Sequence, residues 1–161
     1  MSSNGHSSIT TTNNQFSKQQ TVMNIIITLP HYLWAQICFG TKRIELRKKK
    51  PLYFQNNESK CFVVLKGTHR IIGWFTISNF TKMPTPKPCA PSFAKALCVP
   101  QHWVDEYLKK SDFCYCWHIK KVYAYKQVVD IREDFKIHSN PQSYVYTDKD
   151  PTVPYHPWIR R

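Results

Sequence analysis

The sequence predicts a compact α+β fold, or a partly closed β-barrel, built as one domain. The chain has 161 residues, which suits a single domain of common size, and 42% of them are hydrophobic, which is enough to form a core. Short apolar runs outnumber the segments with helical spacing, and the two kinds of segment mostly do not alternate. A regular alternation of strand and helix would instead have predicted a parallel sheet.

Two segments have the spacing of amphipathic helices. The first follows Pro30, which suits the first turn of a helix, and stops before Gly40, which suits the position just beyond a helix. The second covers residues 101–110. The apolar stripes are Leu33, Trp34, Ile37 and Cys38 in the first helix, and Trp103, Val104, Tyr107 and Leu108 in the second.

The strands are predicted from short runs rich in β-branched and aromatic residues. The longest alternation slips at Lys120-Lys121, which indicates a bulge. Residues 83–91 are rich in proline and are predicted as a loop. The predicted strands are 24–29, 44–46, 61–65, 71–77, 112–125 and 128–131.

Composition divides the chain into three parts. Sixteen of residues 1–22 are Ser, Thr, Asn, Gln or Gly, so this segment is predicted to be a disordered polar tail. Residues 23–137 form the predicted domain. Residues 138–161 are rich in proline, tyrosine and tryptophan, and we expect this C-terminal extension to dock partly on the domain.

The charge balance points to polyanionic partners. Lys and Arg number 23 against 10 Asp and Glu, so the net charge is +13. No apolar run approaches the roughly 18 residues of a membrane span, and the N-terminus lacks the pattern of a secretory signal. We therefore expect no membrane partner and a cytoplasmic protein, with the nucleus as the alternative.

The six cysteines are predicted to be reduced and mostly buried, because four of them lie inside apolar segments. The nearest approach to a zinc motif is Cys114, Cys116 and His118 on one predicted strand. Successive side chains on one face of a strand are roughly 7 Å apart, too far for bonds of roughly 2.0–2.3 Å to one metal. The sequence therefore predicts no metal site and no cofactor.

The most unusual segment runs from Lys42 to Lys50, with six basic residues and a single acid, Glu45. Alternation along a strand would put Ile44 and Leu46 on one face. Glu45 would then lie on the other face, suited to hold a guanidinium or to accept hydrogen bonds from a base edge or an amine. Two interpretations stay open: a solvated basic edge strand with one internal ion pair, or a surface that binds phosphates or bases.

The order of these features resembles the ASCH domain of the PUA-like superfamily over residues 23–137. The match consists of a strand, a helix, the spacing G-x-K-x-x-E-x-R at residues 40–47, and a strand pair with Gly73. A helix ending at Tyr107-Leu108 and an aromatic strand at 116–119 follow. The resemblance implies a small PUA-like β-barrel of five or six strands, flanked by two or three helices. It also implies a cleft between the first helix and the barrel, and binding of nucleic acid, chiefly RNA.

The resemblance nominates Lys42, Glu45 and Arg47 as residues that line this cleft. Charge alone predicts further phosphate contacts, which position a ligand without reading its sequence and weaken with salt. Thr68 lies on a turn expected at the rim. The basic residues expected at phosphates are Lys48, Lys49, Lys50, Lys66 and Arg70.

Three aromatic residues are candidates for stacking on a base, namely Trp34, Trp74 and Tyr107. The alternative is that each of these side chains is buried in the core instead of facing a ligand. Glu45 and Arg47 would then read the base edge, and a cleft that takes one extruded base suits so small a chain.

An enzyme is the alternative reading. The resemblance includes bacterial hydrolases that remove an acetyl group from N4-acetylcytidine with a Lys, a Thr three residues on, and a distant Glu. Lys42 fits the first position and would be the catalytic residue, but Glu45 stands at the Thr position. Asp105 or Glu106 are the candidates for the distant acid.

A ribonuclease and a protein-interaction module are further alternatives. A ribonuclease would need an acid and a base with pKa values near 7, for which His69 and His102 are the candidates. In an interaction module, the basic strand would dock an acidic protein. We expect a monomeric module that binds RNA or another single-stranded nucleic acid, or a modified nucleoside, and leave open whether it turns a substrate over.

Overall fold

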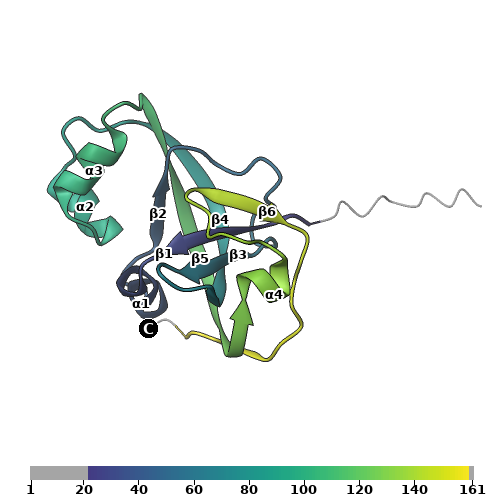
Figure 1. Cartoon of the computed structure of the whole chain (residues 1–161). Coiled ribbons are helices and arrows are strands. Elements are labelled where there is room, and N and C mark those ends of the chain that lie inside the picture. Colours follow the sequence, from purple (N-terminus) through teal and green to yellow (C-terminus); the bar gives the residue numbers. More distant parts are fainter. Residues whose placement is uncertain (1–21, 160–161) are drawn as a thin grey trace, which may run out of the picture.

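The computed structural model describes residues 22–159, so the predicted polar tail lies outside the described residues except for Val22. Over this range the chain forms a mixed α+β fold with seven strands and four helices (Figure 1). In chain order the elements are β1 (Asn24–Leu29), α1 (His31–Phe39), β2 (Ile44–Arg47), β3 (Cys61–Leu65), β4 (Arg70–Pro84), α2 (Pro91–Leu97), α3 (Gln101–Leu108), β5 (Phe113–Asp130), α4 (Ile131–Phe135), β6 (Tyr144–Thr147) and β7 (Tyr155–Pro157).

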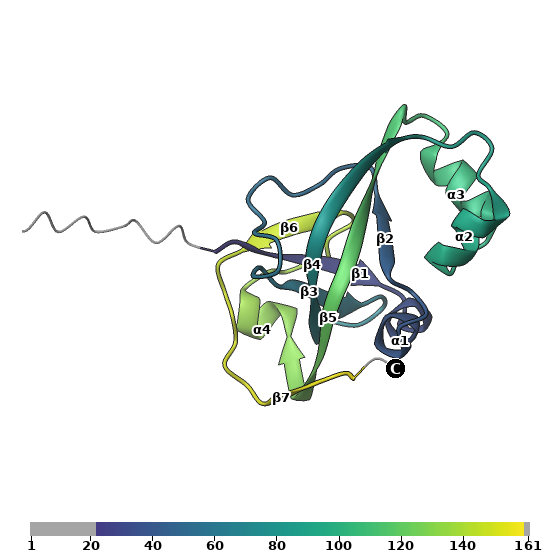
Figure 2. The ribbon, with the colours of Figure 1, turned by 180° about the vertical axis from the view of Figure 1, so that it is seen from behind.

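All seven strands belong to one sheet. Its order is β2-β5-β4-β3-β1-β6, with β7 paired to β5 away from this path. Only β1 and β3 run parallel, and the other pairs are antiparallel. Within residues 22–159 no ladder joins the end strands β2 and β6, so the sheet is open and the small β-barrel implied by the resemblance is not shown (Figure 2).

The element counts exceed the prediction of five or six strands and two or three helices. The segment predicted as an extension supplies β6, which pairs with β1, and β7, which pairs with β5. The helix α2 begins at Pro91, at the end of the proline-rich stretch. The helix α4 is a single short turn whose N-cap, Asp130, accepts hydrogen bonds from the backbone of Arg132 and Glu133. Helices this short carry too little periodicity to be detected from the sequence.

The long strands β4 and β5 cross the whole molecule. The two runs predicted at 112–125 and 128–131 are one strand, β5. The bulge expected at Lys120-Lys121 is confirmed, because Phe75 pairs with Val122 while Ile77 pairs with Ile119. Gly73 lies where these strands pass α1, and a Cβ there would overlap the carbonyl oxygen of Tyr123.

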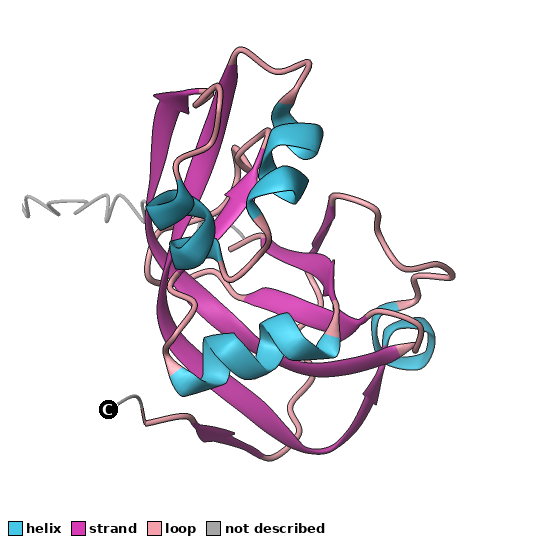
Figure 3. Ribbon diagram, turned by 90° about the vertical axis from the view of Figure 1, so that its left-hand side faces the viewer, coloured by secondary structure: helices cyan, strands magenta, loops and turns pink. Residues whose placement is uncertain are grey.

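The core is divided among three clusters. The first lies between α1 and the sheet, and the predicted stripe of Leu33, Trp34, Ile37 and Cys38 is buried there. The second lies beside α4, and the third joins α2, α3 and the start of β5. Figure 3 shows α1 lying across the strands, with α2 and α3 together at one end of the sheet. No helix in the described range is long and apolar enough to cross a membrane.

Candidate functional site

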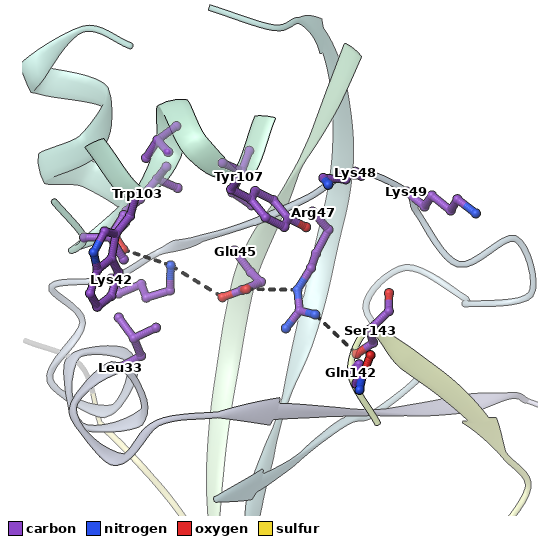
Figure 4. A pocket seen from close by; sticks show the side chains of 14 residues that line it. Leu33, Lys42, Glu45, Arg47, Lys48, Lys49, Trp103, Tyr107, Gln142 and Ser143 are labelled. Carbon is purple, nitrogen blue, oxygen red and sulfur yellow. Dashed lines mark hydrogen bonds and ion pairs between the residues drawn. The ribbon is translucent and has the colours of Figure 1, made fainter. Parts of the chain in front are cut away.

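A pocket of about 580 Å³ opens between β2 and the pair α2–α3 (Figure 4). Its volume lies within the range of small-molecule binding sites. The first helix and the segment before β6 close its other sides. The lining residues are Leu33, Lys42, Glu45, Leu46, Arg47, Lys48, Lys49, Leu97, Val99, Trp103, Val104, Tyr107, Gln142 and Ser143.

The strand β2 carries the charged part of this pocket. Gly40 ends α1 with a left-handed φ of 78°, as expected for a helix C-cap. The backbone N–H of Lys42 donates to the carbonyl of Gln36 at 3.0 Å, which holds the start of β2 against the helix. From there β2 pairs with β5, where Glu45 lies opposite Trp117.

The expected alternation along β2 is confirmed. Ile44 and Leu46 pack against the cluster that joins α2 and α3. Glu45 is only 6% exposed, and the side chain of Arg47 is 11% exposed. The segment is therefore not a solvated basic edge, because its acid and the adjacent guanidinium are withdrawn from water.

The amine of Lys42 is fully engaged. Lys42 is 2% exposed, and its Nζ donates to the carbonyls of Ile44 at 2.6 Å and Leu97 at 3.0 Å. The same atom lies 3.5 Å from Oε2 of Glu45. Two of the three donor hydrogens of the ammonium thus go to backbone carbonyls, and its contact with Glu45 is an ion pair and not a hydrogen bond. Lys42 therefore ties β2 to the end of α2.

The two carboxylate oxygens of Glu45 differ in their contacts. Its Oε1 accepts a hydrogen bond from Nε of Arg47 at 3.0 Å. Arg47 Nη1 in turn donates to the carbonyl of Ser143 at 3.2 Å. Oε2 of Glu45 is buried and accepts no hydrogen bond from residues 22–159. A buried charged acceptor without a hydrogen bond is costly, and it offers a binding atom to a donor that enters the pocket.

Two aromatic residues one turn apart on α3 form the opposite wall. Trp103 is 50% exposed and Tyr107 is 40% exposed. The Nζ of Lys48 lies 4.7 Å from the centre of the Tyr107 ring, in the geometry of a cation–π contact. Burial raises the pKa of the Tyr107 hydroxyl, while Arg47 and the backbone of Lys48 act in the opposite direction. The side chain of Tyr107 is therefore a neutral phenol where it lines the pocket.

Of the three predicted stacking residues, only Tyr107 lines the pocket, and the structure corrects the other two. Trp34, a residue of α1, is 5% exposed and packs in the core between this helix and the sheet. Trp74 is 3% exposed and stacks on Tyr123 with ring centres 4.8 Å apart. Trp103, which is in the same predicted stripe as Tyr107, was not among the predicted stacking residues, because helical spacing does not show which residues of a stripe border a pocket.

The predicted basic residues separate into two groups. Lys48 and Lys49 line the pocket, and Lys50 follows them at an exposed position. The turn between β3 and β4, which carries Lys66 and Thr68, is exposed, as is Arg70 at the start of β4, and none of these three residues lines the pocket. The carbonyl of Thr68 accepts a hydrogen bond from the side chain of Asn140 at 2.6 Å.

The residues considered for catalysis, other than Lys42, lie outside the pocket. Asp105 accepts a hydrogen bond from the backbone of Cys89 at 2.8 Å, and Glu106 is exposed. His69 and His102 are both exposed, and neither is a lining residue. Within residues 22–159 no three His, Cys, Asp or Glu side chains are grouped to hold a metal ion.

Comparison with known proteins adds the class of fold to this description. Crystal structures of the ASCH protein from Zymomonas mobilis, and of its serine-to-alanine and tyrosine-to-phenylalanine mutants, each superpose with a TM-score of 0.62 and 12% identity. The alignments cover 76% of this chain and 86% to 88% of those structures. No protein-family model matches the sequence, and no curated protein matches it significantly. The chain therefore has the ASCH fold, which confirms the resemblance at the level of the fold.

Proposed function

We propose that this chain binds RNA or another single-stranded nucleic acid and takes one nucleobase into the pocket on β2. The observation that carries the proposal is the buried Oε2 of Glu45, which has no hydrogen-bond donor among the described residues although the cations Lys42 and Arg47 flank its carboxylate. Such an atom is suited to a ligand that presents an N–H group.

The charge on Glu45 indicates which part of a nucleotide would enter. A carboxylate accepts hydrogen bonds from the amino and imino groups of bases and repels phosphates. A phosphate therefore does not suit the floor of the pocket, where Glu45 lies. Lys48 and Lys49, at the rim, suit the phosphates of the same strand.

The walls of the pocket favour a flat, apolar ring. Trp103 and Tyr107 offer aromatic surface on one side, and Leu33 and Leu97 add apolar contact. Stacking of a base on an aromatic side chain is worth about 1–3 kcal/mol. A base that reaches Glu45 must be unpaired, because its Watson–Crick edge is occupied in a duplex. These features support a single-stranded ligand.

A hydrolase that acts on a modified nucleoside is the second candidate, favoured by one feature, a buried lysine beside a carboxylate in a pocket. The contacts of Lys42 argue against it, because two hydrogen bonds to backbone carbonyls hold the amine between β2 and the end of α2 and direct its N–H groups away from a substrate in the pocket. No second carboxylate from the described residues lines the pocket. Binding without turnover is therefore the better-supported function.

The test uses the near-isosteric variant Glu45→Gln. Titration with homopolymeric RNA hexanucleotides at physiological salt should show a loss of affinity of about 10- to 100-fold, because a charged acceptor is replaced by an amide. The control is Glu106→Gln, which neutralises an exposed carboxylate on α3 outside the pocket. Thermal melting of each variant would show that it is folded.

The same titration distinguishes the alternatives. Free nucleosides should compete with the hexanucleotides, and at least one base should compete better than the others. Binding that follows ionic strength alone, with no competition by any nucleoside, would contradict the proposal. Release of acetate from N4-acetylcytidine would favour the hydrolase instead.

A further inference from the structure

A second exposed aromatic site lies in the loop after β2. Leu52 and Tyr53 are 77% and 68% exposed. The residues on either side of them, Pro51 and Phe54, are buried. The two anchors fix the ends of this turn, so its large apolar side chains are directed to solvent by the fold.

Two tyrosines of β6 hold the same loop in place. The hydroxyl of Tyr146 accepts a hydrogen bond from the backbone N–H of Tyr53 at 3.4 Å, and the two rings meet at 61° with centres 5.5 Å apart. The hydroxyl of Tyr144 donates to the carbonyl of Lys50 at 3.3 Å. Tyr53 is therefore an exposed ring on a braced backbone, which reduces the entropy lost when a ligand stacks on it.

The loop is continuous with the pocket. Lys49 and Ser143 both line the pocket. Lys50 follows Lys49 and Tyr144 follows Ser143, and these two next residues are joined by the hydrogen bond described above. Figure 4 shows Lys49 and Ser143 on the side of the pocket that faces away from Lys42 and Trp103. A nucleic-acid strand that left the pocket on this side would pass Lys48, Lys49 and Lys50 before it reached Tyr53.

We propose that Tyr53 is the stacking platform for a second nucleotide of the strand whose neighbouring base occupies the pocket. This proposal rests on the proposed function. Lys49 and Lys50 would contact backbone phosphates of these two nucleotides. The sequence has no acidic residue between Glu45 and Glu58, so this stretch favours a phosphate-rich partner over a neutral or basic protein surface.

The experiment compares a ligand that fills only the pocket with one that is long enough to reach Tyr53. The four nucleoside monophosphates and the corresponding RNA hexanucleotides are titrated against the unchanged chain, Tyr53→Ala and Tyr53→Phe. Tyr53→Ala should lose about 5- to 150-fold in affinity for the preferred hexanucleotide. Its affinity for the monophosphate should not change, and Tyr53→Phe should retain both, because stacking uses the ring and not the hydroxyl.

The control is Phe39→Ala, which removes an aromatic side chain that is 73% exposed at the end of α1 and does not line the pocket. It should bind both ligands normally. In addition, Lys50→Ala should lower the slope of log affinity against log salt by about 0.7 for the hexanucleotide, as expected for one phosphate contact on a single strand.

The outcomes separate the two proposals. If Tyr53→Ala binds the hexanucleotide normally while Glu45→Gln does not, the second site is wrong and the pocket stands. If Tyr53→Ala weakens the monophosphate and the hexanucleotide equally, its effect is on the pocket or the fold, and the second site is also wrong. If no monophosphate binds and Glu45→Gln has no effect on any ligand, the proposed function fails.

Discussion

At the scale of single residues, the pocket depends on a buried charge triad of Lys42, Glu45 and Arg47. Withdrawing charges from water is costly, and their mutual attraction offsets this cost only when the geometry is good. Here each cation has a second role: Lys42 donates to two backbone carbonyls, and Arg47 donates to the carbonyl of Ser143. The triad therefore contributes to the stability of the fold as well as to the pocket. Variants at its three positions should differ in how far they affect stability and how far they affect binding.

Removal of the Lys42 amine should mainly affect stability. Lys42→Met keeps the aliphatic stem but leaves the carbonyls of Ile44 and Leu97 without their donor, and Glu45 with one cation fewer. We expect the free energy of unfolding to fall by about 3 kcal/mol, measured by urea titration. Lys66→Met, on an exposed turn, should change it by less than about 0.5 kcal/mol. Equal effects of the two variants would show that Lys42 is not a tether.

At the scale of elements, β2 and α3 supply the two functional sides of the pocket. The strand has a period of two, so every second residue of β2 reaches the same side, and Glu45 and Arg47 act together. The helix places residues three and four apart on one face. Val104 and Leu108 are buried against the sheet, while Trp103 and Tyr107 border the pocket. The apolar stripe of α3 is therefore wider than its buried part.

Tryptophan fluorescence should report on α3 when a ligand binds. Three of the five tryptophans are no more than 5% exposed, whereas Trp103 and Trp158 are 50% and 40% exposed. Addition of the hexanucleotides should quench the emission of Trp103, because a base would stack near it. Trp103→Phe should lose the quenching but bind with similar affinity, and Trp158→Phe should retain the quenching. Quenching that disappears with Trp158 instead would place the ligand elsewhere.

At the scale of the whole molecule, the pocket lies where the two ends of the open sheet approach one another. No ladder joins β2 to β6 in the described range, but side chains span the gap. Arg47 reaches the carbonyl of Ser143, and Tyr144 packs against Trp117 with ring centres 5.9 Å apart. An open sheet leaves room between its end strands that a fully closed barrel would fill with its own ladder. This arrangement gives the pocket and the Tyr53 loop a common border.

The buried thiols should make the folded state sensitive to alkaline pH. Burial raises the pKa of Cys114 from 9.0 to about 11, and it raises the pKa of Cys61 as well. Between pH 9 and 11 the unfolded chain loses the Cys114 proton while the folded chain retains it. The stability from this group is therefore fully present below pH 9 and is lost as the pH rises towards 11, by on the order of 2 kcal/mol.

Urea unfolding at pH 8 and pH 10 would measure this loss. Cys114→Ala should unfold with a smaller decrease between the two pH values than the unchanged chain. Val104→Ala removes atoms from the same cluster without removing a titrating group, so it should lower stability equally at both pH values. A decrease that is the same in all three proteins would contradict the assignment to Cys114.

Much of the fold and part of the site could be predicted from local patterns. The stripe of α1, the span of β2 and the bulge at Lys120-Lys121 follow from spacing within a few residues. The predicted grouping of Lys42, Glu45 and Arg47 rested on one short motif, and the structure brings these residues into one pocket. The sequence left two places open for Trp34 and Trp74, the core and the pocket, and the structure places both in the core through contacts with strands and helices far away in the sequence.

The order of apolar and basic residues was thus enough to predict β1 to β5 and the helices α1 and α3. It also showed a single acid among cations on β2. Secondary structure and alternation depend on neighbouring residues, so they can be read from local sequence. Tertiary contacts alone decided that residues 138–159 complete the sheet, that Trp103 rather than Trp34 or Trp74 borders the pocket, and that Oε2 of Glu45 is left without a donor. The physical reason is that burial and hydrogen bonding at these atoms depend on groups from β5, α3 and the C-terminal segment. No pattern within β2 encodes where those groups lie.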